Sequence, residues 1–262
     1  MNLLLAGLVM AGIGGAAALS LAFANRKFFY LDESHADGIV PKLSANGEKL
    51  VARLACAGGS NVAWTRARYE GLGTCRAAAL VGGGGKGCAW GCLGLGDCAR
   101  VCEFGAITMN EHGLPVVDES KCTACGDCVT VCPKQLFSIH PISHRLWVAC
   151  KSLQHGEAAE AECEVACNGC GRCAADAPGV VCIKDNLAVV DYTQNHAGAR
   201  DAIHGCPTGA IVWIDEKLGP VKGAEAKHIT RKSSLPVKPK ANGTNGTSAA
   251  HRTSSAGTEA KS

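Results

Sequence analysis

Four cysteines stand close together near the middle of the chain: Cys122, Cys125, Cys128 and Cys132, with Pro133 directly after the last. In a C-x2-C-x2-C-x3-C-P run of this kind, three thiolates hold one 4Fe-4S cluster and the fourth holds a neighbouring cluster. Zinc sites pair their cysteines at wider separations, so the spacing favours an iron–sulfur cluster over zinc. The chemistry predicted for this segment is therefore the transfer of single electrons.

A related run lies upstream and ends on the same C-x3-C spacing, at Cys98 and Cys102. Leu95 stands where the second cysteine of such a run would fall, and Cys88 supplies a thiolate from further back. If each run lends its last cysteine to the other cluster, two complete ligand sets result. One set is Cys88, Cys92, Cys98 and Cys132, and the other is Cys102, Cys122, Cys125 and Cys128.

The pattern repeats downstream in an incomplete form. Ala177 occupies the place of the fourth cysteine of the run, and residues 191–205 contain no cysteine. Under the same exchange of last ligands, these losses remove every ligand of one cluster and none of the other. One cluster is therefore expected here, and the chain is predicted to hold three 4Fe-4S clusters. The ligands of the third are Cys167, Cys170, Cys173 and Cys206.

The remaining cysteines have no assigned ligand role: Cys56, Cys75, Cys150, Cys163 and Cys182. Two thiolates cannot complete a cube, so Cys56 and Cys75 are interpreted as ordinary residues, and Cys150 likewise. Cys182 aligns with Ile107 of the first module, between the first two cysteine runs, and is predicted to be a small buried apolar residue. Cys163 precedes Cys167 with the spacing that Cys88 has to Cys92, so it is kept as an alternative ligand.

Short strands are predicted between the cysteine runs. Residues 106–109 and 114–118 are expected to form a hairpin around His112 and Gly113, and residues 186–191 repeat its second strand. The predicted fold is therefore α+β, with two tandem ferredoxin-like 4Fe-4S modules at residues 88–145 and 146–216. The second module is expected to hold one cluster.

The start of the chain has the composition of a membrane anchor. Residues 3–24 form an uncharged run of 22 residues, which is long enough for a helix to cross the roughly 30 Å hydrocarbon core. Arg26 and Lys27 follow this run, so the positive-inside rule predicts a single pass through the cell inner membrane with the cysteines on the cytoplasmic side. A cleaved signal peptide is the alternative, but the basic n-region is missing.

Composition also sets the other boundaries. The anchor is predicted at residues 1–27, a juxtamembrane linker at 28–55 and a connecting segment at 56–87. Residues 217–262 are dominated by polar residues, glycine and proline and are predicted to be a disordered tail, because they cannot bury enough apolar surface.

Several classes of function are excluded. A net charge of +3 and an aromatic content of 5% give no basis for nucleic-acid binding. The glycine-rich residues 82–87 depart from a phosphate-binding loop, because Leu80 and Gly87 replace its first glycine and its hydroxyl residue. No dinucleotide fingerprint is present. The chain is therefore predicted to carry electrons and not to be catalytic alone.

Several segments together resemble the B subunit of Rnf-type electron-transport complexes: GLGTCRAA at Cys75, GGKGCAWGCLGLGDC ending at Cys98, GLPVVD ending at Asp118, and NLAVVD ending at Asp191. The resemblance implies an iron–sulfur subunit of a membrane complex that moves electrons between ferredoxin and NAD while translocating sodium ions or protons. It also implies soluble ferredoxin, the membrane and other subunits of the complex as partners.

One departure from that family is clear. Its members carry an extra four-cysteine cluster domain directly after the anchor, whereas residues 25–55 of this chain contain no cysteine. Two alternatives therefore stay open. One is an iron–sulfur relay subunit of a membrane-bound hydrogenase or formate dehydrogenase, and the other is an interaction protein whose clusters only stabilise small domains.

Overall fold

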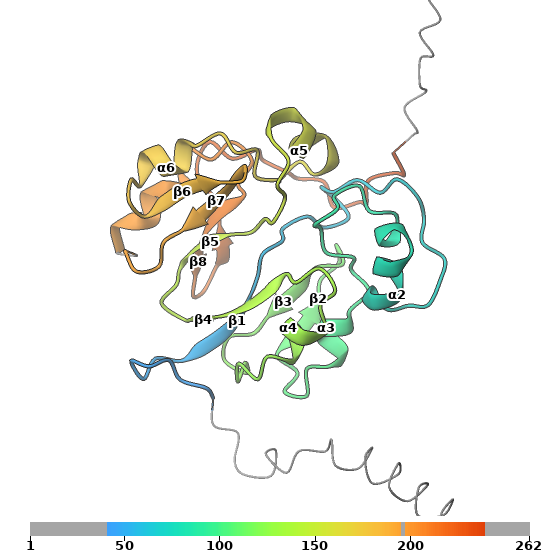
Figure 1. The fold of residues 1–262 in the computed structure, drawn as a ribbon, viewed down its shortest axis with the longest axis horizontal. Coiled ribbons are helices and arrows are strands. Elements are labelled where there is room, and N and C mark those ends of the chain that lie inside the picture. Colours follow the sequence, from blue (N-terminus) through green and yellow to red (C-terminus); the bar gives the residue numbers. More distant parts are fainter. Residues whose placement is uncertain (1–40, 195–196, 239–262) are drawn as a thin grey trace, which may run out of the picture.

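The computed structural model describes residues 41–194 and 197–238 (Figure 1). The predicted anchor at residues 1–27 lies outside these ranges. Within them, no helix is both long and apolar enough to cross a membrane. The described part mixes short helices with short strands, as expected for an α+β, ferredoxin-like protein.

The first module runs in the order strand, helix, hairpin, helix, strand. Its elements are β1 (Leu50–Leu54), α3 (Asp97–Arg100), β2 (Ile107–Met109), β3 (Pro115–Val117), α4 (Asp127–Val131) and β4 (Phe137–Pro141). β1 pairs antiparallel with β4, with Leu54 opposite Phe137. β2 pairs with β3, which confirms the hairpin predicted around His112 and Gly113.

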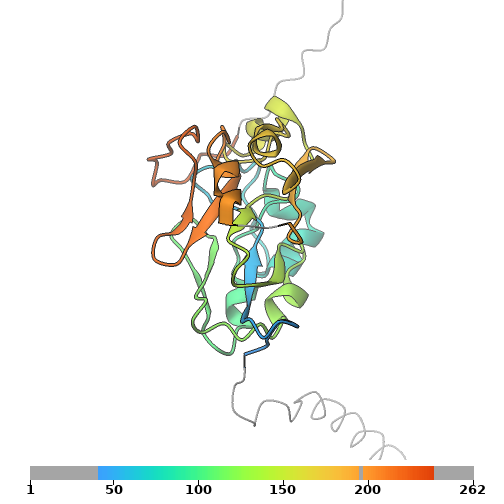
Figure 2. The same cartoon turned by 90° about the vertical axis from the view of Figure 1, so that its left-hand side faces the viewer.

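The second module repeats this order. Its elements are β5 (Leu146–Val148), α6 (Arg172–Asp176), β6 (Val181–Lys184), β7 (Leu187–Val190), the 3₁₀ helix Ala197–Ile203, and β8 (Ile211–Asp215), followed by β9 (Gly219–Val221). β5 pairs with β8 as β1 pairs with β4. The second module lies above the first in both views (Figures 1 and 2).

Each module carries an insertion between its first strand and its first helix. In the first module this insertion holds α2 (Cys75–Leu80) and the 3₁₀ helix Gly82–Gly85. In the second it holds α5 (Gly156–Glu162). The two insertions contain all the cysteines that lie outside the predicted ligand sets except Cys182.

Aromatic side chains join the two modules. Trp147 of β5 donates a hydrogen bond of 2.8 Å from Nε1 to the Leu54 carbonyl oxygen at the end of β1. The Tyr192 ring stacks on His144 with a centroid distance of 4.0 Å, and the Tyr192 hydroxyl donates to the Leu146 carbonyl oxygen. The Trp147 hydrogen bond fixes the first strand of one module against the first strand of the other, and Tyr192 packs against the segment that leads into β5.

Two predicted boundaries differ from the structure. The linker predicted at residues 28–55 includes β1, because residues 50–54 find their partner strand more than eighty residues later. The disordered tail predicted from residue 217 begins too early, since residues 217–238 include β9 and contact the rest of the chain. The Leu235 amide donates to the Ser60 carbonyl oxygen at 2.8 Å, and Arg231 pairs with Glu164 at 3.0 Å. Backbone hydrogen bonds and ion pairs hold this segment, and composition does not reveal them.

Candidate metal centre

All the cysteines are free, and sixteen of the seventeen gather in four groups of four. A left-handed glycine directly precedes each of three short helices that carry one of these cysteines. These are Gly96 before α3, Gly126 before α4 and Gly171 before α6, with φ angles of 78°, 100° and 78°. Glycine adopts this conformation at little cost. The backbone therefore turns sharply and places the next cysteine on the first helical turn, where it is buried: Cys98, Cys128 and Cys173.

The first thiol group lines one pocket and consists of Cys75, Cys92, Cys98 and Cys132. Leu54 and Phe137 contribute apolar walls. Burial, with smaller contributions from the neighbouring Cys75 and Cys132, raises the pKa of Cys98 to about 12. Cys75, the first residue of α2, thus stands where the sequence predicted Cys88.

The second thiol group consists of the four predicted cysteines Cys102, Cys122, Cys125 and Cys128. Burial raises the pKa of Cys128 to about 12, and the negative charges of the other three thiolates act in the same direction. The Sγ atom of Cys122 accepts a hydrogen bond of 3.4 Å from the backbone amide of Ala52 in β1. The strand missed by the sequence prediction thus supports this group directly.

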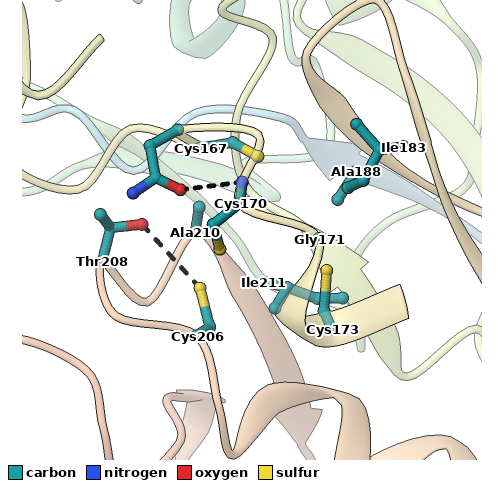
Figure 3. A pocket seen from close by; sticks show the side chains of 11 residues that line it. Cys167, Cys170, Gly171, Cys173, Ile183, Ala188, Cys206, Thr208, Ala210 and Ile211 are labelled. Carbon is teal, nitrogen blue, oxygen red and sulfur yellow. Dashed lines mark hydrogen bonds between the residues drawn. The ribbon is translucent and has the colours of Figure 1, made fainter. Parts of the chain in front are cut away.

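The third thiol group lines another pocket and consists of Cys167, Cys170, Cys173 and Cys206 (Figure 3). The Asn168 side-chain oxygen accepts a hydrogen bond from the Cys170 amide at 3.2 Å and so shapes the loop. The Thr208 hydroxyl lies 3.9 Å from the Cys206 Sγ atom. The structure brings together all four cysteines that the sequence grouped here.

The fourth thiol group consists of Cys56, Cys88, Cys150 and Cys163, which line a further pocket. Sequence reasoning places Cys88 in another set and treats Cys56 and Cys150 as ordinary residues. It misses this group because its members come from four separate segments with no common spacing. The feature of the sequence that could have revealed this group was the number of cysteines without an assigned ligand role.

Cys182 lies apart from these groups. It occupies β6 and is exposed, so the prediction of a small buried apolar residue is wrong. Its register partner in the hairpin is Val189, which is also exposed. Both side chains therefore belong to the solvent-facing side of the two-stranded sheet.

The spacing within the groups bears on the kind of metal. Among the described residues, no three His, Cys, Asp or Glu side chains converge closely enough to hold a single metal ion. A tetrahedral zinc ion would draw four sulfur atoms to about 2.3 Å from one point. A 4Fe-4S cube instead takes one thiolate at each of its irons, so the thiolates surround a larger body. Thiols that line a common pocket without converging on one point fit the cube better than the single ion.

The pKa values of the buried cysteines determine how these sites can bind a metal. Burial raises the pKa of Cys92 and Cys173 to about 12, so both thiols are protonated at neutral pH without a metal. Metal ligands must be thiolates, and binding therefore releases protons. Several buried thiolates repel one another and have little water around them to stabilise their charge. Positively charged iron offsets this repulsion and so allows the neighbouring cysteines to be charged together.

Thiol-lined cavities on strand, helix and hairpin modules define an iron–sulfur protein of the ferredoxin-like class. Residues 88–136 match the family model of the 4Fe-4S dicluster domain. This match confirms that the chain carries 4Fe-4S cluster sites in the part where the first two cysteine runs lie.

Comparison with longer proteins shows which kind of iron–sulfur protein the chain is similar to. The chain is 39% identical over 164 residues to the B subunit of the Na(+)-translocating ferredoxin:NAD(+) oxidoreductase complex of Acetobacterium woodii, covering 62% of this chain and 49% of that protein. It is 39% identical over 166 residues to the B subunit of the ion-translocating oxidoreductase complex of Methanosarcina acetivorans, covering 63% and 62%. It is 42% identical over 169 residues to the B subunit of the proton-translocating ferredoxin:NAD(+) oxidoreductase complex of Clostridium ljungdahlii, covering 64% and 60%.

These relatives confirm the resemblance to the B subunit of Rnf-type complexes. The chain spans about half of the first relative's length and about three fifths of the other two.

Proposed function

We propose that this chain is an electron-carrying subunit of an Rnf-type membrane complex and relays electrons between ferredoxin and NAD, coupled to ion translocation. The observation that carries this proposal is the identity of 39 to 42% with the B subunit of three ion-translocating oxidoreductase complexes. The names of these relatives favour this role over that of a hydrogenase or formate dehydrogenase subunit.

Three 4Fe-4S clusters are proposed, one on each of the first three thiol groups. Relative to the sequence prediction, Cys75 replaces Cys88 in the first group, because Cys75 lines that cavity with Cys92, Cys98 and Cys132. A cube bound by four thiolates exchanges one electron without losing a ligand.

The chain's own residues would bring the first two clusters close together. Cys98 of the first group and Cys102 of the second lie four residues apart on and just after α3. Cys128 of the second group and Cys132 of the first repeat this arrangement at α4. Each helix therefore serves both groups, and an electron crossing between them would travel about the length of one helical turn.

Other subunits would supply the catalytic sites for NAD, and soluble ferredoxin would supply the electrons. We further propose that residues 1–27 anchor the chain in the cell inner membrane with its cysteines on the cytoplasmic side. The support is the uncharged run at residues 3–24 followed by Arg26 and Lys27.

Rapid anaerobic mixing with reduced low-potential ferredoxin tests the role. The visible absorbance of the clusters should bleach as electrons enter them. Cys206→Ala, which removes a ligand of the third group, should lower the amplitude of the bleach and keep the remainder. If the wild-type protein, with its clusters intact, accepts no electrons from ferredoxin, the proposed role is wrong.

A further inference from the structure

We propose that Cys56, Cys88, Cys150 and Cys163 bind an additional 4Fe-4S cluster, and that this cluster links those of the first and third thiol groups. The proposal rests on the proposed electron-carrying function and adds a step to its route. It changes the expected number of clusters from three to four.

The four thiols converge from distant segments. Cys56 follows β1, Cys88 follows the glycine-rich 3₁₀ helix, Cys150 follows β5 and Cys163 follows α5. All four line one common pocket, and its volume of about 20 Å³ is close to those at the third and first groups, about 10 and 20 Å³. A space lined by four thiols, of the same size as two other four-thiol sites, fits the same kind of cluster.

Backbone amides already point at these sulfur atoms. The Cys56 Sγ atom accepts hydrogen bonds of 3.4 Å from the amides of Gly58 and Cys92. The Cys150 Sγ atom accepts from the amides of Ser152, at 3.4 Å, and Cys167, at 3.3 Å. Hydrogen bonds to sulfur stabilise thiolates and help to set the potential of an iron–sulfur cluster. A merely buried, neutral thiol does not need two amide donors.

Two of these donors show where the group lies in the molecule. Cys92 is a member of the first group and Cys167 is a member of the third, and each donates its amide to a sulfur atom of the fourth. The fourth group therefore stands between the other two and is one hydrogen bond from each. Because electron transfer slows steeply with distance, a cluster here would shorten the passage between the modules.

A lysine supplies positive charge at the same cavity. Lys86 lines it, and its ammonium group donates to the Gly58 carbonyl oxygen at 2.6 Å. Burial raises the pKa of Cys163 to about 12, whereas the Lys86 charge acts in the opposite direction. A cationic side chain suits a set of four thiolates and is out of place in a packing of neutral thiols.

Iron and sulfide analysis of the anaerobically purified full chain decides the number of clusters. Four cubes would give about sixteen iron atoms per chain, and three would give about twelve. Zinc is measured in the same samples. A wild-type content of about twelve iron atoms, or a zinc ion that accompanies twelve, would overturn the proposal.

Cysteine variants locate the additional cluster. Cys150→Ala should lower the iron content by about four atoms, and Cys56→Ala provides the same test if the first variant does not fold. The matched control is Cys182→Ala, which removes an exposed thiol of the second module and should leave the iron content unchanged. Unchanged iron in a folded Cys150→Ala or Cys56→Ala variant would contradict the assignment.

The link between the modules has a magnetic readout. Reduced clusters that lie close together broaden one another's electron paramagnetic resonance signals, so the signals of the first and third groups should sharpen in Cys150→Ala. Signals that stay unchanged while four irons are lost would place the cluster elsewhere. Failure of ferredoxin to reduce a protein with sixteen irons would reject the proposed function and leave this site standing.

Discussion

The two modules share the same order of strands and helices and differ in the residues that form their interiors. Both pair their first strand with their last, and both turn a hairpin that ends on an aspartate. Asp118 and Asp191 each accept two hydrogen bonds at Oδ1 from the residue two positions later, Ser120 and Thr193. These bonds hold the pKa of both carboxyl groups below its usual range. The loop that leads into the missing cluster site has thus kept its geometry.

The interiors of the two modules also differ. In the first module the core around the hairpin contains the buried thiols of Cys98, Cys122 and Cys128. In the second, the core contains the buried thiols of Cys167, Cys173 and Cys206 together with the apolar residues Ala177, Ala202 and Ile203. Burial of apolar surface also stabilises a small domain, so we propose that this packing supports the second module in the absence of a second cluster.

The largest predicted effect tests this difference in cluster number. Cys206→Ala should remove the single cluster of the second module and about four iron atoms, because Cys206 is the only cysteine after Cys182. The apolar core should keep the module folded, as judged by an unchanged far-ultraviolet circular dichroism spectrum.

The control for this variant is Cys182→Ala, in the same module. Loss of about eight irons from Cys206→Ala would mean that the second module holds two clusters. Unchanged iron would mean that Cys206 is not a ligand. Either result would break the comparison between the modules.

Local spacing explains which ligand sets were predictable. All four cysteines of the third group follow from one short run and from Cys206, the last cysteine of the chain. The second group follows in the same way from adjacent runs. In both cases the chain itself places the ligands near one another, so the sequence spacing reflects the three-dimensional arrangement.

The exchange of Cys75 for Cys88 could not be read from spacing. Cys88 lies four residues before Cys92, which favours the same cluster for both, but the glycine-rich segment directs Cys88 into a different cavity. Cys75 reaches the first group through the fold of α2, which ends seventeen residues before α3 begins. The path of an insertion depends on contacts with distant segments, and these contacts leave no periodic pattern.

Strand β1 shows the same limit for the fold. The hairpins were predictable because their strands are neighbours in sequence. β1 and β4 are separated by the whole first module, and five residues of mixed polarity do not reveal that pairing.

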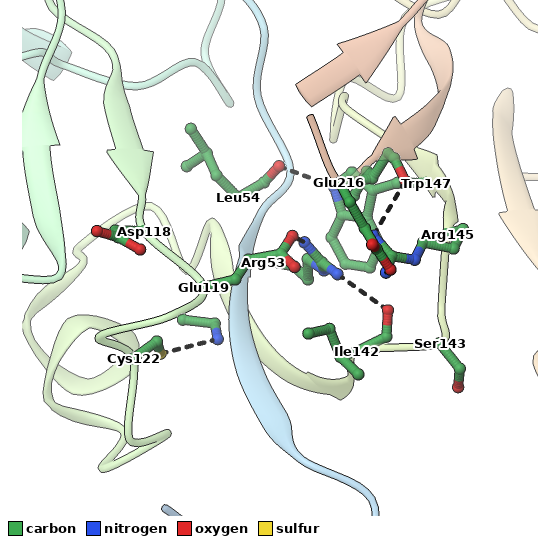
Figure 4. A network of polar contacts seen from close by, with 12 residues as sticks. Arg53, Leu54, Asp118, Glu119, Cys122, Ile142, Ser143, Arg145, Trp147 and Glu216 are labelled. Carbon is green, nitrogen blue, oxygen red and sulfur yellow. Dashed lines mark hydrogen bonds and ion pairs between the residues drawn. The ribbon is translucent and has the colours of Figure 1, made fainter. Parts of the chain in front are cut away.

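A second, smaller effect concerns the ion pairs of the two modules (Figure 4). Arg53 of β1 pairs with Glu119, and their side chains are 6% and 24% exposed. Arg145, just before β5, pairs with Glu216, whose side chain is 76% exposed. Removing the partner of a buried charge is far more costly than breaking a pair at the surface.

Glu119→Gln should therefore lower the free energy of unfolding by about 3 kcal/mol, since it leaves the buried Arg53 guanidinium without a counter-charge. Glu216→Gln is the matched control and should cost less than about 1 kcal/mol. Anaerobic urea unfolding of both variants measures the difference. Equal losses would show that burial of Arg53 has no influence on its ion pair.

The smallest effect lies in the turns of the two hairpins. In the second module Asp185 and Asn186 connect β6 to β7 with φ angles of 49° and 64°, a left-handed pair of the kind that two-residue hairpin turns require. In the first module the turn takes its positive φ at Gly113, at 69°, where no side chain opposes it. Asparagine and aspartate tolerate this conformation better than other residues with a side chain.

Asp185→Ala should therefore destabilise the protein by roughly 1 kcal/mol, because alanine lacks the polar side chain that eases a left-handed conformation. Glu111→Ala alters an exposed residue in the turn of the first hairpin, outside the residues with positive φ, and should change stability by less than about 0.5 kcal/mol. Asn186, which follows Asp185, accepts a hydrogen bond from the Cys167 thiol at its carbonyl oxygen. Neither substituted residue is itself a member of a thiol group, so the iron content should stay at the wild-type value. Shifts in the urea midpoint measure the difference. A cost at Glu111 as large as that at Asp185 would show that the two hairpins are held by something other than the backbone conformation of their turns.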